Sequence, residues 1–187
     1  MDIAEHLIHA LFEEVLEVHL PRPFPVMSFS DAMSKFGTDR PDLRIPFELI
    51  EISDLMQEAE FKVFSEPAKK PGSRVVALRI PEGGTLTRHQ IDTYTEYVRQ
   101  FGAGGLAYIK VNSVSSGRDG LQSPILKFLT DEIVALVMQR TRAADGDLIF
   151  FGADTASVVN DSLGALRIRL GHDLGFVSEA WLSLIHI

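Results

Sequence analysis

The chain has 187 residues, 45% of them hydrophobic, and this length allows one sizeable core and part of a second. Its formal net charge of −8 excludes a protein that coats nucleic acid with its whole surface, although a local basic patch can still hold phosphate groups. Cysteine is absent, which excludes disulfides and thiolate metal sites, and neither an export signal nor an apolar run of roughly 20 residues is found. A soluble cytoplasmic protein is therefore expected.

The first predicted element is an N-terminal helix with one apolar face. Apolar residues recur there at helical spacing, at Ile3, Leu7, Ile8, Leu11, Phe12, Val15 and Leu16. Two alternatives concern its polar residues. His6 and His9 with Glu13 could be metal ligands, but a fourth ligand is missing. Glu13, Glu14 and Glu17 could be a paired-carboxylate site. A solvated helix face is the interpretation preferred for both sets, because adjacent charges on a surface helix are usually solvated.

Prolines interrupt the chain after this helix. Pro21, Pro23 and Pro25 restrict backbone torsions and hold the segment extended. A short helix is predicted from Ser30 to Phe36, followed by a rigid, charged loop over residues 37–46.

Short β-like runs alternate with helices from Phe47 onward. Two strand candidates, Phe61–Phe64 and Arg74–Ile80, are expected to pair as an antiparallel hairpin, with Lys69 and Lys70 at its tip. The next helix begins at a capping box formed by Thr87 and Gln90. The remaining predicted elements are a strand over 106–111, a helix opened by Ser123-Pro124, a strand over 148–151 and a helix from about Thr155 to Gly171.

Glycines at 102, 104 and 105 raise the possibility of a phosphate-binding loop. Such a loop follows a strand and opens a helix, whereas these glycines end a helix and open a strand, so a helix cap is the preferred interpretation. The order of elements from residue 60 is β-β-α-β-α-β-α. We therefore predict an α+β fold, with a two-layer arrangement in which helices cover one face of a sheet.

Several exact strings resemble one protein family. The segment that follows motif 2 in bacterial-type aspartyl-tRNA synthetases is similar to FPVMSF at 24–29 and FGTDRPDLR at 36–44. The inserted α+β domain of these class II enzymes, the GAD domain, is similar to LRIP at 78–81, LTRHQID at 86–92, GLAYIKV at 105–111 and DLIFFGAD at 147–154. Ordered matches along most of the chain are more specific than any single motif. The same inserted domain occurs in the B and E subunits of tRNA-dependent amidotransferases.

The resemblance implies a division of the chain. Residues 1–46 would be part of the class II catalytic domain, residues 47–172 the inserted GAD domain, and residues 173–181 a return into the catalytic domain. Residues 182–187 do not fit the family's continuation and are expected to be a non-native tail. The family's three signature motifs, its aspartate pocket and its anticodon-binding barrel have no counterpart here, so no catalytic, cofactor-binding or metal-binding residue is transferred.

The function implied by the resemblance is that of an aspartate-tRNA ligase, which activates aspartate with ATP and transfers it to tRNA. The parent enzyme would use Mg²⁺ with ATP, bind tRNA and aspartate, and form a homodimer, whereas this part alone is expected to bind no cofactor and to be inactive. Two alternatives stay open. The chain could belong to a subunit of a tRNA-dependent amidotransferase, or it could be a free-standing tRNA-binding module.

Two sets of charged residues are the candidate sites. The first set consists of Lys69, Lys70 and Arg74. These cations at a hairpin tip are either solvated or contact the tRNA backbone, since lysine and arginine are the usual phosphate partners. The second set consists of Asp39, Arg40, Asp42 and Arg44. We expect its members to pair internally and to brace the catalytic domain, and contact with a ligand or tRNA is the alternative.

Overall fold

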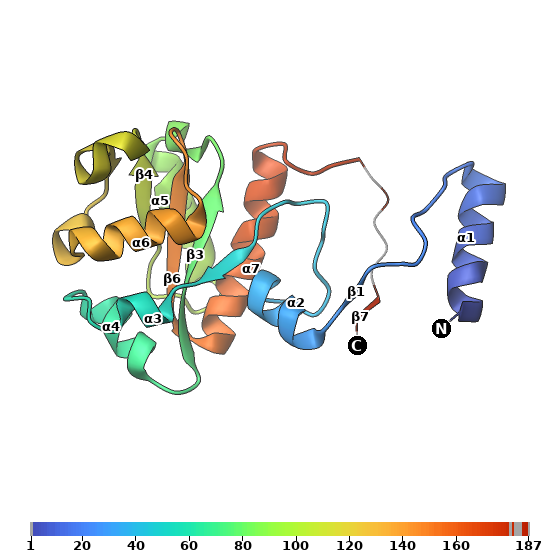
Figure 1. The fold of residues 1–187 in the computed structure, drawn as a ribbon, viewed down its shortest axis with the longest axis horizontal. Helices are drawn as coiled ribbons and strands as arrows, with labels where there is room; N and C mark the ends of the chain where they lie inside the picture. The colour runs from blue at the N-terminus through green and yellow to red at the C-terminus, as the bar shows by residue number, and fades with distance from the viewer. Residues whose placement is uncertain (1, 180, 182–184, 187) are drawn as a thin grey trace.

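A five-stranded sheet organises the fold, in a computed structural model that describes residues 2–179, 181 and 185–186. The sheet and its helices lie at one end of the molecule, and the N-terminal helix lies at the other (Figure 1). The strand order is β2-β3-β6-β4-β5, and each neighbouring pair is antiparallel. In chain order the strands are β2 (Leu49–Glu51), β3 (Ser73–Ile80), β4 (Ala107–Val111), β5 (Leu121–Gln122) and β6 (Leu148–Thr155). The predicted α+β class is confirmed.

The sequences of β3 and β6 explain why both faces of this sheet are buried. β3 and β6 pair over their full length, from Ser73 opposite Thr155 to Ile80 opposite Leu148. Successive side chains of a strand point to opposite faces, so a strand that is apolar at nearly every position needs cover on both sides. The apolar residues of β3, from 75 to 78 and at 80, are all buried.

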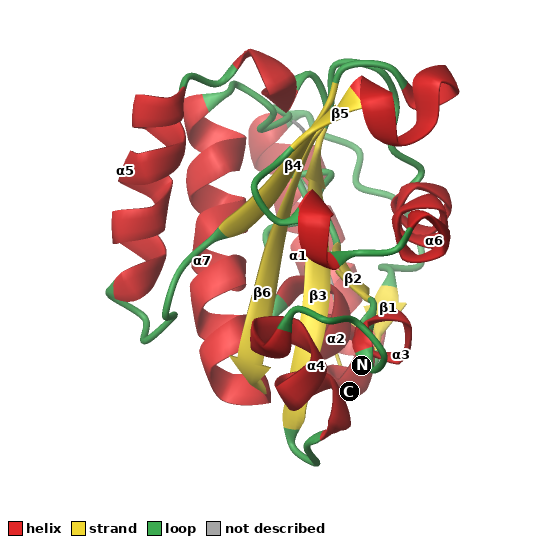
Figure 2. Cartoon of the chain, turned by 90° about the vertical axis from the view of Figure 1, so that its left-hand side faces the viewer, coloured by secondary structure: helices red, strands yellow, loops and turns green. Residues whose placement is uncertain are grey.

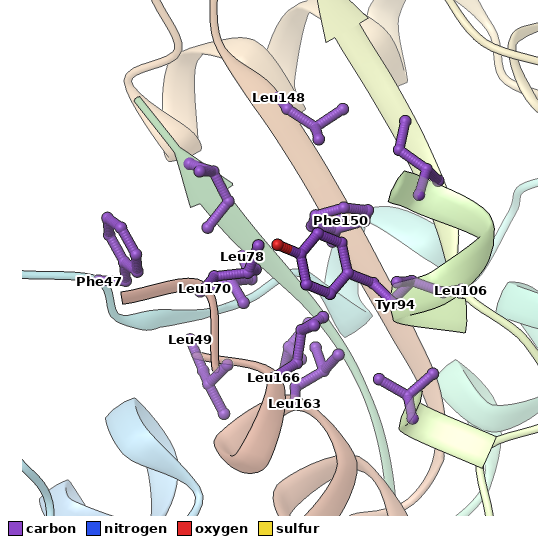
Figure 3. Packing of buried hydrophobic residues seen from close by; sticks show 14 of the residues in the cluster. Phe47, Leu49, Leu78, Tyr94, Leu106, Leu148, Phe150, Leu163, Leu166 and Leu170 are labelled. Carbon is purple, nitrogen blue, oxygen red and sulfur yellow. The ribbon is translucent and has the colours of Figure 1, made fainter. Parts of the chain in front are cut away.

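Helices cover both faces of the sheet (Figure 2). On one face lie α5 (Arg88–Arg99) and α7 (Ala156–Asp173), and on the other lie α3 (Ser53–Met56), α4 (Lys62–Lys69) and α6 (Asp131–Thr141). Each face of the sheet thus carries its own hydrophobic core. Figure 3 shows the core on the side of α5 and α7, where the rings of Tyr94 in α5 and Phe150 in β6 contact each other with 6.4 Å between their centroids. The prediction of helices on one face only was therefore wrong.

The predicted strand at Phe61–Phe64 was also wrong, because this stretch opens helix α4. Phe61 and Phe64 are three residues apart and contact each other edge to face at 4.9 Å, as neighbours on a helix surface do. Phe64 also reaches Phe151 of β6, at 5.7 Å. β3 pairs with β2 along one edge and with β6 along the other, so residues 61–64 are not its partner and residues 69–70 do not form a hairpin tip.

The helix starts were predicted with mixed success. The Thr87–Gln90 capping box is present at α5, and Thr155 caps α7 through the amide of Val158. Ser123-Pro124 opens only the short 3-10 turn η3 (Leu126–Phe128), and α6 starts later, at Asp131, with Thr130 as its cap. The other 3-10 turns are η1 (Gly83–Thr85) and η2 (Val114–Gly120).

The N-terminal helix α1 (Asp2–Leu16) stands apart from the sheet and its helices (Figure 1). Most of its apolar face is open to solvent, with Ile3 86% and Leu7 59% exposed, while Ile8 and Phe12 are half-buried. His9, predicted to be solvated, is buried and stacks on Phe24 at 4.7 Å, because the extended segment after α1 folds back over it. The three glutamates at 13, 14 and 17 are exposed, as predicted.

A two-stranded ladder and helix α2 (Phe29–Phe36) complete the structure. β1 (Val26–Met27) pairs in parallel with β7 (Ile185–His186). The expected non-native tail lies partly outside the described residues, at 182–184 and 187. In the part of the chain that is described, no helix combines the length and apolar character needed to cross a membrane.

Candidate functional site

The charged loop over residues 37–46 begins where α2 ends. Gly37 takes a left-handed conformation with φ of 72° and donates its amide to Met33, which closes the helix. The Arg44 side chain donates two hydrogen bonds to the Asp42 carboxylate, from Nε at 2.9 Å and from Nη2 at 2.7 Å. These hydrogen bonds hold the pKa of Asp42 below its usual value and raise the pKa of Arg44. The predicted internal pairing is thus present at this pair.

The rest of the charged set is more open. The Arg40 guanidinium lies 3.8 Å from Asp39, and both side chains are exposed. Ion pairs with this exposure contribute roughly 0–1 kcal/mol, so they do not hold the loop in place. The loop is held in place by hydrogen bonds from helix α7 instead.

Arg167 of α7 is the residue that holds the loop, and sequence reasoning missed it. Its side chain is fully buried, and it donates to the carbonyl oxygens of Phe47 at 2.5 Å, Ile45 at 2.5 Å and Asp42 at 2.8 Å. Its guanidinium also lies 4.7 Å from the centre of the Phe36 ring. Burial lowers the pKa of Arg167 to about 10, which leaves it charged at neutral pH. The sequence did contain a signal for a buried cation, because Arg167 lies between Leu166 and Leu170 on the apolar face of α7.

Arg74 lies inside the molecule and not at a surface tip. It is 8% exposed, and its guanidinium bonds to Glu51 at 2.9 Å and to the side chain of Asn160 at 2.7 Å. It also donates to the carbonyl oxygens of Ser34 at 2.9 Å and Met33 at 3.4 Å. Alternation along β3 points Arg74 to the face that α7 covers, together with Val76 and Leu78. Its placement with the two lysines was therefore wrong, because four of its five N–H groups bond to partners inside the molecule.

Lys69 and Lys70 do lie on the surface, at the C-terminal end of α4. Both are exposed, and the Lys69 ammonium is 3.4 Å from Glu58. The amide of Lys70 caps the helix by donating to Pro67. A phosphate contact by these two lysines stays a prediction.

A hollow of about 880 Å³ lies between η2 and α6. Its apolar lining includes Val134 and Met138. Arg118 closes one side by bonding to Asp131 and to the carbonyl oxygens of Leu126 and Leu129. The lining offers contacts to a ligand but no pairing of a nucleophile with a base.

The described residues do not fit an ATP–Mg²⁺ site on their own. Among them, no three histidine, aspartate or glutamate side chains come together as metal ligands. The two buried arginines, Arg74 and Arg167, direct most of their donors to carbonyl oxygens or side chains of the chain itself. These two arginines therefore hold backbone segments of the chain in place.

Comparison with protein families gives one finding. The model of the GAD domain matches residues 64–163, from Phe64 in α4 through the sheet to Leu163 in α7. A GAD domain is typical of aminoacyl-tRNA synthetases and related enzymes. The match covers more than half of the 187 residues and contains four of the five sheet strands. The chain belongs to the GAD domain family.

Proposed function

We propose that this chain is part of an aspartate-tRNA ligase, an enzyme that activates aspartate with ATP and transfers it to tRNA. The observation that carries the proposal is the FGTDRPDLR loop at 36–44, joined to a GAD domain. The GAD domain supports a synthetase or a related tRNA enzyme. The loop string favours the aspartyl enzyme, because it resembles the segment after motif 2 of that family.

The proposal divides the work between this chain and the rest of the parent enzyme. Bound ATP with Mg²⁺ would supply the leaving group and neutralise charge on the phosphates during adenylate formation. The groups that bind ATP and aspartate would come from parts of the parent that this chain does not contain. This chain would contribute the GAD domain and the charged loop packed on it. We further propose that the parent is a cytoplasmic homodimer.

The runner-up is a subunit of a tRNA-dependent amidotransferase, in which the GAD domain also occurs. The two functions differ in chemistry: the ligase forms pyrophosphate from ATP in the presence of aspartate, whereas the amidotransferase amidates an amino acid already attached to tRNA. Flanking genomic sequence with motif 2 upstream and motif 3 downstream would favour the ligase.

The test is an assay of the full-length protein from its natural gene beside the 187-residue chain. The full-length protein should catalyse aspartate-dependent exchange of pyrophosphate into ATP and should charge aspartate tRNA, whereas the chain alone should do neither. Glutamine-dependent amidation without exchange would replace the proposal with the runner-up. Exchange by the chain alone would contradict the division of work.

A further inference from the structure

The end of helix α2 meets α7 through direct backbone contact. A Cβ atom on Gly37 would lie 2.5 Å from the carbonyl oxygen of Asn160, and a Cβ atom on Gly164 would lie 3.0 Å from that of Phe36. The approach at Gly37 is closer than a Cβ atom tolerates, and Gly37 also has a left-handed φ of 72°, so glycine is required there; the approach at Gly164 is tighter than most Cβ contacts. α2 and α7 therefore sit in van der Waals contact at this point, with no side-chain layer between them.

Arg74 ties the last turn of α2 to three other elements. Its hydrogen bonds to the carbonyl oxygens of Met33 and Ser34 satisfy acceptors at the C-terminal end of the helix. Its positive charge also interacts favourably with the negative end of the helix dipole. The same guanidinium bonds to Glu51 of β2 and Asn160 of α7. One buried side chain thus joins α2, β2, β3 and α7.

Arg167 does the same for the loop that follows α2. Its three carbonyl acceptors lie at residues 42, 45 and 47. The side chains of Ile45 and Phe47 belong to the core between α7 and the sheet. Phe47 also contacts Phe176 at 4.9 Å. The end of the loop is therefore anchored in the packed body through Ile45 and Phe47, while Asp39 and Arg40 face solvent.

Helix α1 has a different set of partners. The Glu5 carboxylate accepts the amide of Phe24 at 2.8 Å, and His9 stacks on the Phe24 ring. Phe12 contacts Trp181 edge to face at 5.2 Å. Phe24 lies in the segment between α1 and α2, and Trp181 lies in the segment after α7. These contacts of α1 are therefore made to connecting segments and not to the sheet or the helices that cover it.

We infer that α2 and the charged loop 37–47 form one rigid body with the GAD domain, held by Arg74 and Arg167 as positioning residues, and that the joint to α1 lies in residues 17–27. Any movement of the GAD domain then carries Asp39–Arg44 with it. The inference goes beyond the proposed function, because it concerns which residues move together and uses no catalytic step.

Spin labels can test the inference, because the chain has no cysteine and accepts labels only where cysteine is introduced. One pair, Ser30→Cys in α2 with Glu132→Cys in α6, spans the proposed body. A second pair, Ala10→Cys in α1 with Glu132→Cys, spans the proposed joint. Pulsed dipolar spectroscopy should give a narrow distance distribution for the first pair and a broad one for the second. Equally broad distributions would overturn the inference.

The role of the arginines is tested by Arg74→Lys and Arg167→Lys together, which keep the charge but remove the planar fork. The narrow distribution of the 30–132 pair should be lost, while a pair inside the GAD domain, Glu96→Cys with Glu132→Cys, should stay narrow. This internal pair also detects unfolding, in which case Arg74→Lys alone is measured. The matched control is Arg140→Lys, since Arg140 bonds to Asp54 across α3 and α6. An unchanged 30–132 distribution in the folded variants would overturn the role.

Discussion

Helices α1 and α7 have similar apolar patterns in sequence but opposite environments in the structure. The apolar residues of α7 at 159, 163, 166 and 170 are all buried against the sheet, whereas those of α1 at 3, 7, 11 and 15 are all exposed. An amphipathic pattern predicts that a helix needs a partner surface, but it does not say which surface that is. In α7 the partner is the sheet of the same domain. For α1, no described segment of the chain covers the residues at 3, 7, 11 and 15.

Hydrogen exchange should show the largest difference between the two regions. Amides of Leu106–Val111 open only with the body, whereas amides of Leu7–Leu16 open with a helix whose apolar face lacks cover. We expect exchange in α1 to be about a thousandfold faster, a difference of about 4 kcal/mol in opening free energy. The measurement is exchange followed by mass spectrometry or NMR at constant pH. Equal protection of the two segments would mean that α1 is held as firmly as the sheet.

A pair of truncations sharpens the comparison at single residues. Phe150 is fully buried between β6 and α5, so Phe150→Ala should lower the free energy of unfolding by roughly 3–5 kcal/mol through lost burial and a residual cavity. Leu7→Ala, on the exposed face of α1, should change it by less than about 0.5 kcal/mol. Denaturant unfolding of both variants checks the pair. A large loss from Leu7→Ala would show that α1 packs in solution.

Local signals in the sequence predicted the parts of the fold that are decided locally. The Thr87–Gln90 box and the Thr155 cap depend on residues within one helical turn, and both are present. Phe61 and Phe64 misled the strand prediction, because two aromatic residues suit a strand and one turn of helix equally well. Cover on the second face of the sheet depends on contacts with segments distant in sequence, and no periodicity within a strand reveals which helix supplies it.

The candidate site was predicted less well for a related reason. Arg74 and Lys70 are four residues apart and look alike as cations, but their surroundings differ: one follows the pleat of β3 into the body, and the other ends an exposed helix. Arg167 gave only a weak signal, since its partners are carbonyl oxygens about 120 residues earlier in the chain. Backbone acceptors leave no trace in the pattern of residue types.

Gly37 tests the contact between α2 and α7, which lies inside the rigid body and not at its junction with α1. Gly37→Ala places a Cβ atom against the carbonyl oxygen of Asn160 and requires a left-handed conformation of alanine. We expect a loss of about 1–3 kcal/mol in unfolding free energy. Gly104→Ala is the matched control, because a Cβ atom on Gly104 would meet nothing within 4 Å, and it should change stability by less than about 0.5 kcal/mol. Similar thermal stability of the two variants would contradict the tight contact.

The smallest effect is expected at Lys69 and Lys70, where the proposed tRNA contact depends on two lysines at the end of α4. Both can reach outward without desolvation, although Glu58 competes for Lys69. In the full-length parent, Lys69→Gln with Lys70→Gln should reduce the salt dependence of tRNA binding by about two units of slope if both touch phosphates, and by about one if only one does. Selectivity among tRNAs should hold, because phosphate contacts position the nucleic acid without reading its sequence. Lys62→Gln, at the other end of the same helix, is the control. A slope that the double variant leaves unchanged would identify the two lysines as solvated surface residues, and the tRNA contact would have to lie elsewhere on the parent enzyme.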